Sequence, residues 1–324
     1  MNGQHEVVAV HPQISVRPLR ESDLDGADRI MRLAFGTFLG LPDPGTFMGD
    51  AGFVRTRWRA DPAAAFGADA GETLVGSNFA AHWGSVGFFG PLTVHPNFWD
   101  RGVAKALMEP VMQCFERWGT RHAGLFTFAH SAKHVGLYQR FGFWPRFLTA
   151  IMSKRVQPAG RKSEWTTLSA VPQPEQLATL AACRELTDAV LEGLNVGSEI
   201  RAIAEQGLGD TVLVFDGGRL VGLAACHHGP GTEAGGGTCY VKFGAVRPGP
   251  AARVSFGRLL DACEEFAAAN GLSRLEAGNN TARHEAYRSM LERGFRTDLQ
   301  GLAMQRPNDA GYNRPGAFVI DDWR

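Results

Sequence analysis

The chain alternates between short apolar runs typical of strands and longer amphipathic segments typical of helices. Apolar or alternating runs predict strands at 14–17, 74–81, 86–94, 123–128 and 147–152. Apolar residues at helical spacing predict helices at 20–38, 101–118 and 132–141. This pattern predicts a fold that combines strands and helices, in the α/β (α+β) class.

The same order of elements returns in the second part of the chain. Predicted strands lie at 211–215, 220–225, 239–246 and 274–277, and helical segments at 174–206, 251–269 and 281–292. The Val94-His95-Pro96 and Val246-Arg247-Pro248 segments lie 152 residues apart, and Gly142-Phe143 and Gly294-Phe295 have the same spacing. The shared spacing and order predict an internal repeat of two tandem domains.

Composition shifts suggest where these domains begin and end. Residues 1–12 are expected to be a flexible tail, and polar residues at 157–164 a linker. The predicted domains are therefore 13–156 and 165–305. Residues 306–324 are apolar and aromatic to the last position, which predicts an ordered tail packed on the body or on a second copy in a homodimer.

Charge and cysteine content narrow the possible partners. The 324 residues include 33 Lys and Arg and 33 Asp and Glu, so the net charge gives no reason to expect nucleic acid. The five cysteines are scattered without a C-x-x-C pair, which fits a reducing cytoplasm and no metal site. No signal-peptide pattern and no long apolar run is visible, so we expect a cytoplasmic protein without a membrane partner.

Residues 90–107 carry the clearest candidate chemistry. An apolar strand is followed by a turn and by a helix that begins at Gly102. A helix start presents unpaired N–H groups with a positive dipole behind them, which suits a phosphate. Gly102 and Ala104 would let the phosphate approach the backbone. Tight helix–strand packing would also explain a glycine motif taken alone.

Three motifs in order resemble the GCN5-related N-acetyltransferase (GNAT) superfamily. They are Leu92-Thr93-Val94-His95-Pro96, Gly102-Val103-Ala104 and Leu137-Tyr138-Gln139-Arg140-Phe141-Gly142-Phe143. The resemblance covers about 14–154 and, more weakly, 165–305. It implies a mixed, twisted, mostly antiparallel sheet flanked by helices in each of the two domains. Two central strands would splay apart at a β-bulge and admit the pantetheine arm of acetyl-CoA as an added strand. No metal is implied.

The resemblance also assigns site residues. The implied cofactor-binding residues are Leu92, Val94, Trp99, Asp100, Arg101, Gly102, Val103, Ala104, Lys105 and Ser131. Trp99 stands where the family usually has Gln or Arg, and Arg101 is the expected replacement cation. Tyr138 is the implied general acid, which would protonate the departing thiolate. The base that deprotonates the amine is left open among three histidines, His82, His95 and His130.

The second copy departs from this pattern. At the 152-residue spacing, Gly102, Ala104 and Tyr138 correspond to Val254, Phe256 and Met290. Bulky side chains would obstruct a phosphate, and methionine cannot donate a proton. We therefore expect a degenerate second copy without catalytic function.

The leading functional hypothesis is an acetyl-CoA-dependent N-acetyltransferase. It would transfer the acetyl group directly, in a ternary complex, to an amine of a small molecule or peptide. The alternative is a non-catalytic acyl-CoA-binding or sensor protein, and a third possibility is a structural scaffold.

Overall fold

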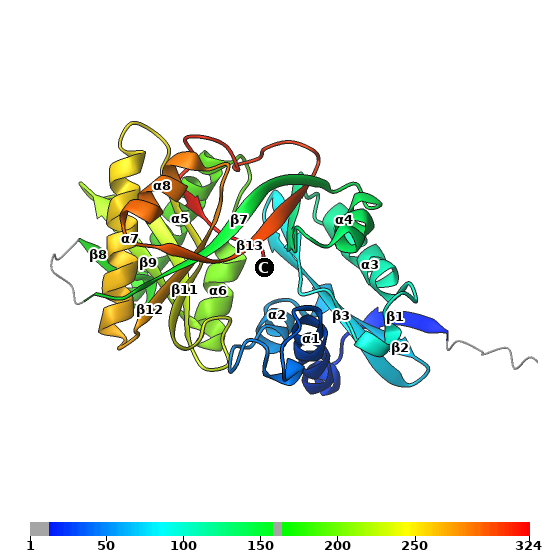
Figure 1. Ribbon diagram of the computed structural model, residues 1–324. Coiled ribbons are helices and arrows are strands. Elements are labelled where there is room, and N and C mark those ends of the chain that lie inside the picture. Colours follow the sequence, from blue (N-terminus) through cyan, green and yellow to red (C-terminus); the bar gives the residue numbers. More distant parts are fainter. Residues whose placement is uncertain (1–12, 158–163) are drawn as a thin grey trace, which may run out of the picture.

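The computed structural model describes residues 13–157 and 164–324. The predicted tail at 1–12 and most of the predicted linker lie outside the described residues. Strands and helices alternate along the chain as the sequence predicts, and they build a mixed α/β fold (Figure 1). Below, the first half denotes residues 13–157 and the second half residues 164–324.

The first half contains four α-helices and seven strands among its described residues. The strands are β1 (Ile14–Pro18), β2 (Ala65–Ala70), β3 (Thr73–Trp83), β4 (Val86–Phe89), β5 (Thr93–Val94), β6 (His122–Thr127) and β7 (Trp144–Arg155). The helices are α1 (Leu24–Phe38), α2 (Val54–Ala60), α3 (Val103–Arg117) and α4 (Ala132–Gln139). The strand predicted at 86–94 is thus broken into β4 and β5.

The second half repeats this order. Its strands are β8 (Trp165–Thr167), β9 (Gly209–Asp216), β10 (Arg219–Gly229), β11 (Gly235–Val246), β12 (Arg274–Asn280), β13 (Arg296–Arg306) and β14 (Val319–Ile320). Among them, β11 stands where the first half has β4 and β5. Its helices are α5 (Gln173–Val190), α6 (Gly197–Gln206), α7 (Ala252–Ala269) and α8 (His284–Glu292). The helical region predicted at 174–206 is therefore two helices, α5 and α6.

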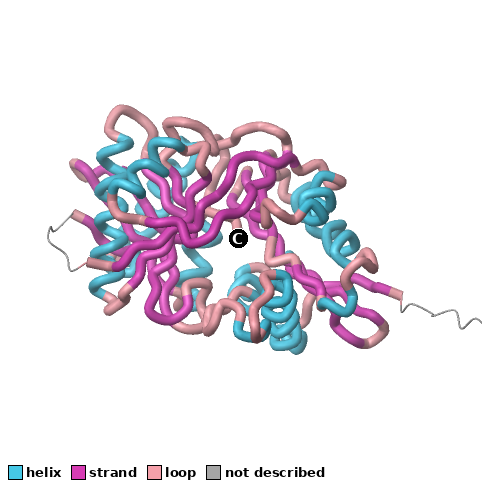
Figure 2. Tube along the Cα trace, viewed as in Figure 1, coloured by secondary structure: helices cyan, strands magenta, loops and turns pink. Residues whose placement is uncertain are grey.

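The strands of both halves join in one sheet, and the halves exchange strands at their junction. The order is β1-β2-β3-β4-β6-β13-β7-β12-β11-β10-β9-β8, with β5 beside β3 and β14 beside β11. β13 of the second half thus lies between β6 and β7 of the first, and β7 pairs with β12. Figure 2 shows these strands crossing the middle of the molecule.

Helices cover both faces of the sheet. In the first half α1 packs on β3, and α3 packs on β2 and β3 in a separate apolar cluster. In the second half α7 covers one face, and α5 and α6 cover the other. Trp83 of β3 packs edge-on against Phe243 of β11, with ring centroids 5.2 Å apart. The hydrophobic core is therefore continuous between the halves.

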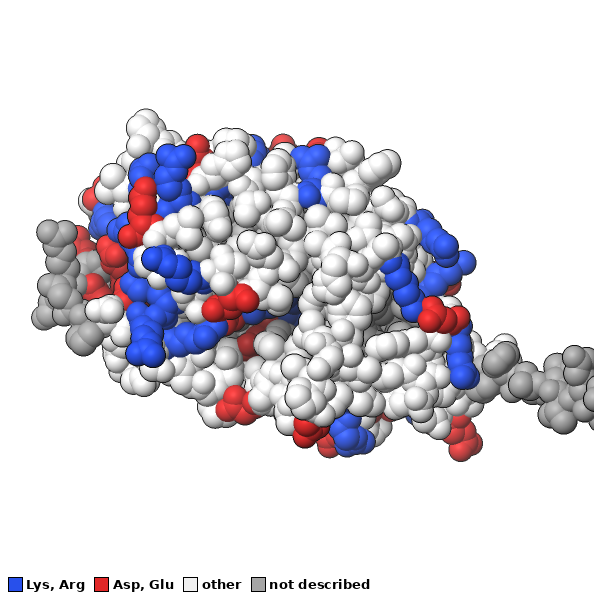
Figure 3. All heavy atoms as spheres, in the orientation of Figure 1, with Lys and Arg blue, Asp and Glu red and all other residues white. Residues whose placement is uncertain are grey.

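Apolar side chains remain exposed where the halves meet. They belong to β7 and β13: Trp144, Phe147, Leu148 and Leu299. Figure 3 shows charged side chains gathered toward the two ends of this face, and its middle is mostly uncharged.

A buried charge cluster also joins the halves. The Arg57 guanidinium of α2 lies 2.9 Å from the Glu233 carboxylate, and Lys242 lies 2.9 Å from the same carboxylate. Lys242 and His227 also contact Glu199, at 3.1 Å and 3.2 Å. Burial alone would raise the pKa of Glu199, but Lys242 and His227 lower it to about 2. Arg57 and Lys242 likewise hold the pKa of Glu233 well below its ordinary value against its burial. Both carboxylates are therefore ionised and depend on their partners.

The Arg57→Leu substitution should destabilise the fold strongly. It leaves the fully buried Glu233 carboxylate with Lys242 as its remaining cationic partner, and breaking a buried pair typically costs about 3–5 kcal/mol. Arg55→Leu on the same helix is the matched control. Its ion pair with Asp25 is largely exposed, so we expect a change within about 0.5 kcal/mol. Urea unfolding measures both, and equal effects would contradict a structural role for the cluster.

Candidate active site

A cavity opens where two neighbouring strands separate. β4 and β6 run parallel, and Phe88–Gly124 is the last pair in their register. Beyond it the chain turns toward β3, where Thr93 and Val94 of β5 pair with Ser77 and Gly76. The edges of β5 and of the end of β6 therefore face each other without pairing in the described sheet. This is the splayed geometry that the family resemblance implies, and here it arises where the chain breaks between β4 and β5.

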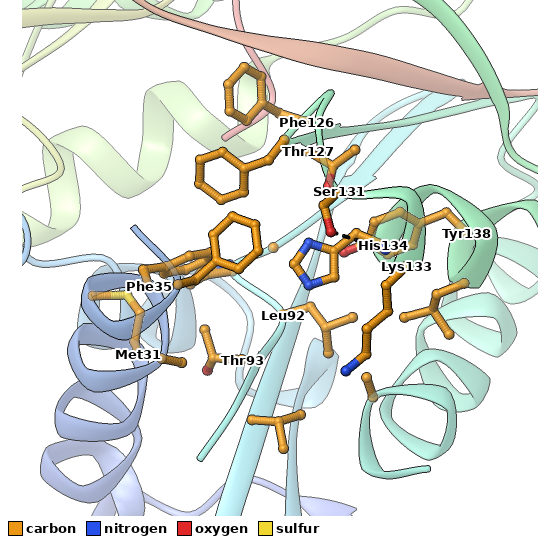
Figure 4. Close-up of a pocket in the computed structure, with 18 of the residues that line it drawn as sticks. Met31, Phe35, Leu92, Thr93, Phe126, Thr127, Ser131, Lys133, His134 and Tyr138 are labelled. Carbon is orange, nitrogen blue, oxygen red and sulfur yellow. Dashed lines mark hydrogen bonds between the residues drawn. The ribbon is translucent and has the colours of Figure 1, made fainter. Parts of the chain in front are cut away.

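The space between these edges belongs to a cavity of about 850 Å³. Most of its lining comes from α1 with the loop that follows, the segment around β5, the start of α3, the end of β6, and α4. Ile151 of β7, Leu299 of β13 and residues 323–324 also contribute. In Figure 4, Met31 and Phe35 of α1 lie on one side and Tyr138 of α4 on the other, with Leu92 and His134 between them.

The structure brings almost all of the predicted site residues to this cavity. Those that line it are Leu92, Val94, Trp99, Asp100, Gly102, Val103, Ala104, Lys105, Ser131 and Tyr138. Arg101 is not among the lining residues. Its guanidinium lies 5.1 Å from the centroid of the Phe98 ring, in a cation–π contact.

The start of α3 provides an anion-binding geometry. Gly102 caps the helix with a φ of +77°, in the left-handed region that glycine adopts without strain. The amide of Ala106, which bonds to the Gly102 carbonyl, is the first one paired within the helix, so the preceding N–H groups face outward. Lys105 lines the cavity nearby, and Lys133 lies 2.5 Å from Asp100. Backbone dipoles and two ammonium groups therefore favour a negatively charged ligand here.

Trp99 has a structural task in this loop. Its indole N–H donates to the Val94 carbonyl over 2.8 Å, which ties the loop to the end of β5. The aromatic residue at this position thus fixes the path of the backbone, whereas the family's usual polar side chain would point to a ligand. The exposed N–H groups of α3 do not depend on that side chain.

Tyr138 is buried at the inner end of α4. Burial raises the pKa of its phenol well above the ordinary value, although a hydrogen bond with Thr127 opposes the shift. The phenol is therefore protonated throughout the neutral range and is able to donate a proton.

His134 lies one helical turn before Tyr138 and also lines the cavity. Burial lowers the pKa of its imidazole, and the nearby Lys133 and His130 lower it further. The neutral ring can therefore accept a proton at pH 7. Sequence reasoning missed this residue, although its spacing of four from Tyr138 places both side chains on one face of the helix.

The three histidines expected as candidate bases are not among the described residues that line the cavity. The His82 ring stacks on Trp118 with centroids 4.9 Å apart. His95 accepts a hydrogen bond from the Asn97 amide. The His130 ring stacks on Phe38, at the outer side of the cavity.

The side of the cavity opposite α4 was also missed. It is formed by aromatic residues of α1 and by the end of the chain, including Phe35, Phe38 and Trp323. The Trp323 ring lies flat against β6, so that a Cβ at Gly124 would stand 2.2 Å from it. Neither contact follows from local periodicity, because the partners are far apart in sequence.

In the part of the chain that the structure describes, no group of three or more His, Cys, Asp or Glu side chains is arranged to hold a metal ion. None of the helices at 13–157 and 164–324 is long and apolar enough to cross a membrane.

Residues 32–143 match the family model of the Acetyltransferase (GNAT) family. This segment contains the broken strand, the start of α3 and Tyr138. Residues 32–143 are a GNAT acetyltransferase domain. The match makes the protein an acyltransferase, which favours the enzyme over the sensor and the scaffold. A search of curated proteins finds no match.

Solved structures with the same fold span the whole chain. A putative acetyltransferase from Pyrococcus horikoshii has a TM-score of 0.69 at 13% identity, covering 100% of this chain and 99% of that one. A GCN5-related N-acetyltransferase from Sphaerobacter thermophilus has a TM-score of 0.58 at 14% identity, with 90% and 95% covered. A fungal glucosamine N-acetyltransferase region has a TM-score of 0.61 at 13% identity, covering 92% of this chain and 38% of that one. These likenesses establish the fold beyond the matched domain.

Proposed function

We propose that the protein is an acetyl-CoA-dependent N-acetyltransferase that acetylates an amine directly in a ternary complex. The observation that carries this proposal is the joining of three features in one cavity: unpaired strand edges, an open helix start and the His134–Tyr138 pair. A sensor would need the first two features, but it would have no use for a proton donor and a proton acceptor one turn apart.

The residues of the cavity fit the cofactor. The edge of β5 would pair with the amide groups of the pantetheine arm, in the manner of an added strand. The first amides of α3, with Lys105 and Lys133, would hold the pyrophosphate. Bound acetyl-CoA would supply an activated acetyl thioester.

Two side chains of α4, the half-buried His134 and the buried Tyr138, would then have complementary tasks. An alkylamine is mostly protonated at neutral pH, and the neutral imidazole of His134 would accept its proton. The neutral amine can then attack the thioester carbonyl. Tyr138 would donate its phenolic proton to the departing thiolate. The nitrogen loses a second proton once it has attacked, and this proton would restore the phenol, while His134 would release the first proton to solvent.

We also propose that the chain is a tandem GNAT protein with one active copy. The order β6-α4-β7 in the first half corresponds to β12-α8-β13 in the second. Met290 stands at the position that corresponds to Tyr138, is fully buried, and offers no proton. The two fold-level likenesses that cover nearly all of both chains support the same organisation.

Tyr138→Phe should lower kcat about 10²–10⁴-fold and leave the Kd for acetyl-CoA nearly unchanged. The substitution removes the proton donor while keeping the ring that packs against Phe89. Thiol release gives kcat and calorimetry gives Kd. Tyr287→Phe on α8 is the matched control and should retain full activity. A Tyr138→Phe enzyme with unchanged kcat would exclude the phenol as the acid.

The kcat/KM of the wild-type enzyme should rise with pH through a midpoint below 6.5, the ordinary imidazole value. Because burial lowers the pKa of His134, the active neutral form is lost only when the pH falls below this midpoint. His134→Asn should lower kcat/KM and abolish the step, whereas His130→Asn should keep it. A midpoint above 6.5, or a step retained in His134→Asn, would assign the proton acceptor elsewhere.

A further inference from the structure

The acceptor side of the cavity is walled by aromatic rings. Phe35 packs against Phe47 with ring centroids 5.3 Å apart, and Phe38 packs against Phe128 at 4.9 Å. Met48 and Trp323 complete this wall. We call these six side chains the aromatic wall. It lies across the cavity from the start of α3, so a molecule that meets the thioester from this side has to pass along it.

The charged residues of the cavity also limit which acceptor can bind. Among the described residues that line it, Asp100 carries the one side-chain carboxylate, and that carboxylate pairs with Lys133. The other cationic lining residues are Lys105, Arg140 and Arg324, of which Arg324 pairs with Glu276 and Asp322. An acceptor with several ammonium groups would therefore find no free side-chain carboxylate among these residues, and Lys105 and Arg140 would disfavour it.

We propose that the acceptor is a monoamine whose body is aromatic or aliphatic, such as an arylalkylamine. This inference rests on the proposed function. The amine end would lie between His134 and Tyr138, and its apolar body would replace water against the aromatic wall. Burial of that body supplies the binding free energy, at about 25 cal/mol per Å² of apolar surface.

Thiol release from acetyl-CoA by the full-length protein tests the proposal with four amines. We expect kcat/KM for 2-phenylethylamine and tryptamine to exceed that for spermidine and kanamycin at least about tenfold. Phe38→Glu places a carboxylate in the aromatic wall and should shift the ratio toward spermidine. Leu177→Glu on α5, where the leucine is 81% exposed, is the control and should not shift it.

The outcomes separate this inference from the proposed function. Preference of the wild-type enzyme for spermidine or kanamycin overturns the inference and keeps the N-acetyltransferase. Faster turnover with octanoyl-CoA than with acetyl-CoA, with no preference among the amines, would make the aromatic wall an acyl-chain site and also overturns it. If no amine releases thiol, the proposed function itself fails.

In the second half, the end of the chain lies between the ends of β11 and β12. This space, called the second slot below, corresponds to the first slot, which is the space between β5 and the end of β6. β14 pairs with β11 through Gly244–Ile320 and Ala245–Val319. On the opposite side, the Asp321 amide donates to the Gly278 carbonyl of β12 over 3.1 Å. At the 152-residue spacing, Gly244 and Gly278 correspond to Leu92 and Phe126, which line the cavity of the first half.

This segment is fixed by buried polar contacts. The Arg283 guanidinium lies 2.6 Å from the Asp321 carboxylate, and the Tyr240 hydroxyl donates to Asp322 over 2.9 Å. A Cβ at Gly278 would stand 2.3 Å from the Asp322 side chain, so glycine is needed for this close approach. The side chains of Arg283 and Asp321 are at most 2% exposed, which makes the segment costly to displace.

We infer that residues 318–322 occupy the second slot as an internal substitute for a pantetheine arm, so that each chain binds one acyl-CoA. This inference rests on the proposed cofactor site. Calorimetry with acetyl-CoA on the full chain should give a stoichiometry of about one. The double substitution Gly102→Val and Ala104→Phe, which copies the side chains of the second half, should abolish binding.

A stoichiometry of about two overturns the inference, and so does a remaining site in the double variant. Far-ultraviolet circular dichroism of that variant ensures that lost binding is not lost folding. If the wild-type chain binds no acetyl-CoA, the proposed function fails as well, and the thiol-release assay distinguishes this case.

Discussion

The pairing of β13 between β6 and β7 is the interaction on which the rest of the structure depends. β13 pairs with β6 along one edge and with β7 along the other, and β7 continues to β12. Without β13, β6 and β7 would expose unpaired edges. Ile151 of β7 and Leu299 of β13 are paired across these two strands, and both line the cavity. The site of the first half is therefore completed by the second, and neither half is expected to form it alone.

The two halves show how one fold can hold either a ligand or its own chain. In the first half the strand breaks after Phe89, and the cavity lies between β5 and the end of β6. In the second half β11 continues unbroken to Val246, and β14 closes the space beside it. The same segment then ends at Trp323 and Arg324, which line the first cavity. The segment that fills the space beside β11 thus also positions two residues that line the cavity of the first half.

The family resemblance of the motifs between Leu92 and Phe143 predicted the site better than the sequence predicted the assembly. These motifs belong to a strand, a helix start and a second helix that lie close together in sequence, and the structure brings their residues to one cavity. Arg101 is the exception, because its side chain turns to Phe98. The exchange of β7 and β13 could not be predicted from the sequence. Both strands have similar hydrophobic patterns, so either one could pair with β6, and the choice depends on contacts between residues far apart in the chain. His134 and Trp323 were missed for related reasons: one lacks a motif of its own, and the other reaches the cavity through a distant contact.

The groups that suit a phosphate and the groups proposed to transfer protons lie in different parts of the cavity. At its outer end the amides of α3 and the exposed Lys133 suit a phosphate, which stays charged. Deeper inside, burial acts on two ionisable groups in opposite directions: it raises the pKa of Tyr138 and lowers that of His134. Both shifts favour the neutral form, as desolvation always does. A neutral phenol and a neutral imidazole are the forms that donate to a thiolate and accept from an ammonium. One physical effect therefore prepares both ends of the proposed proton transfer.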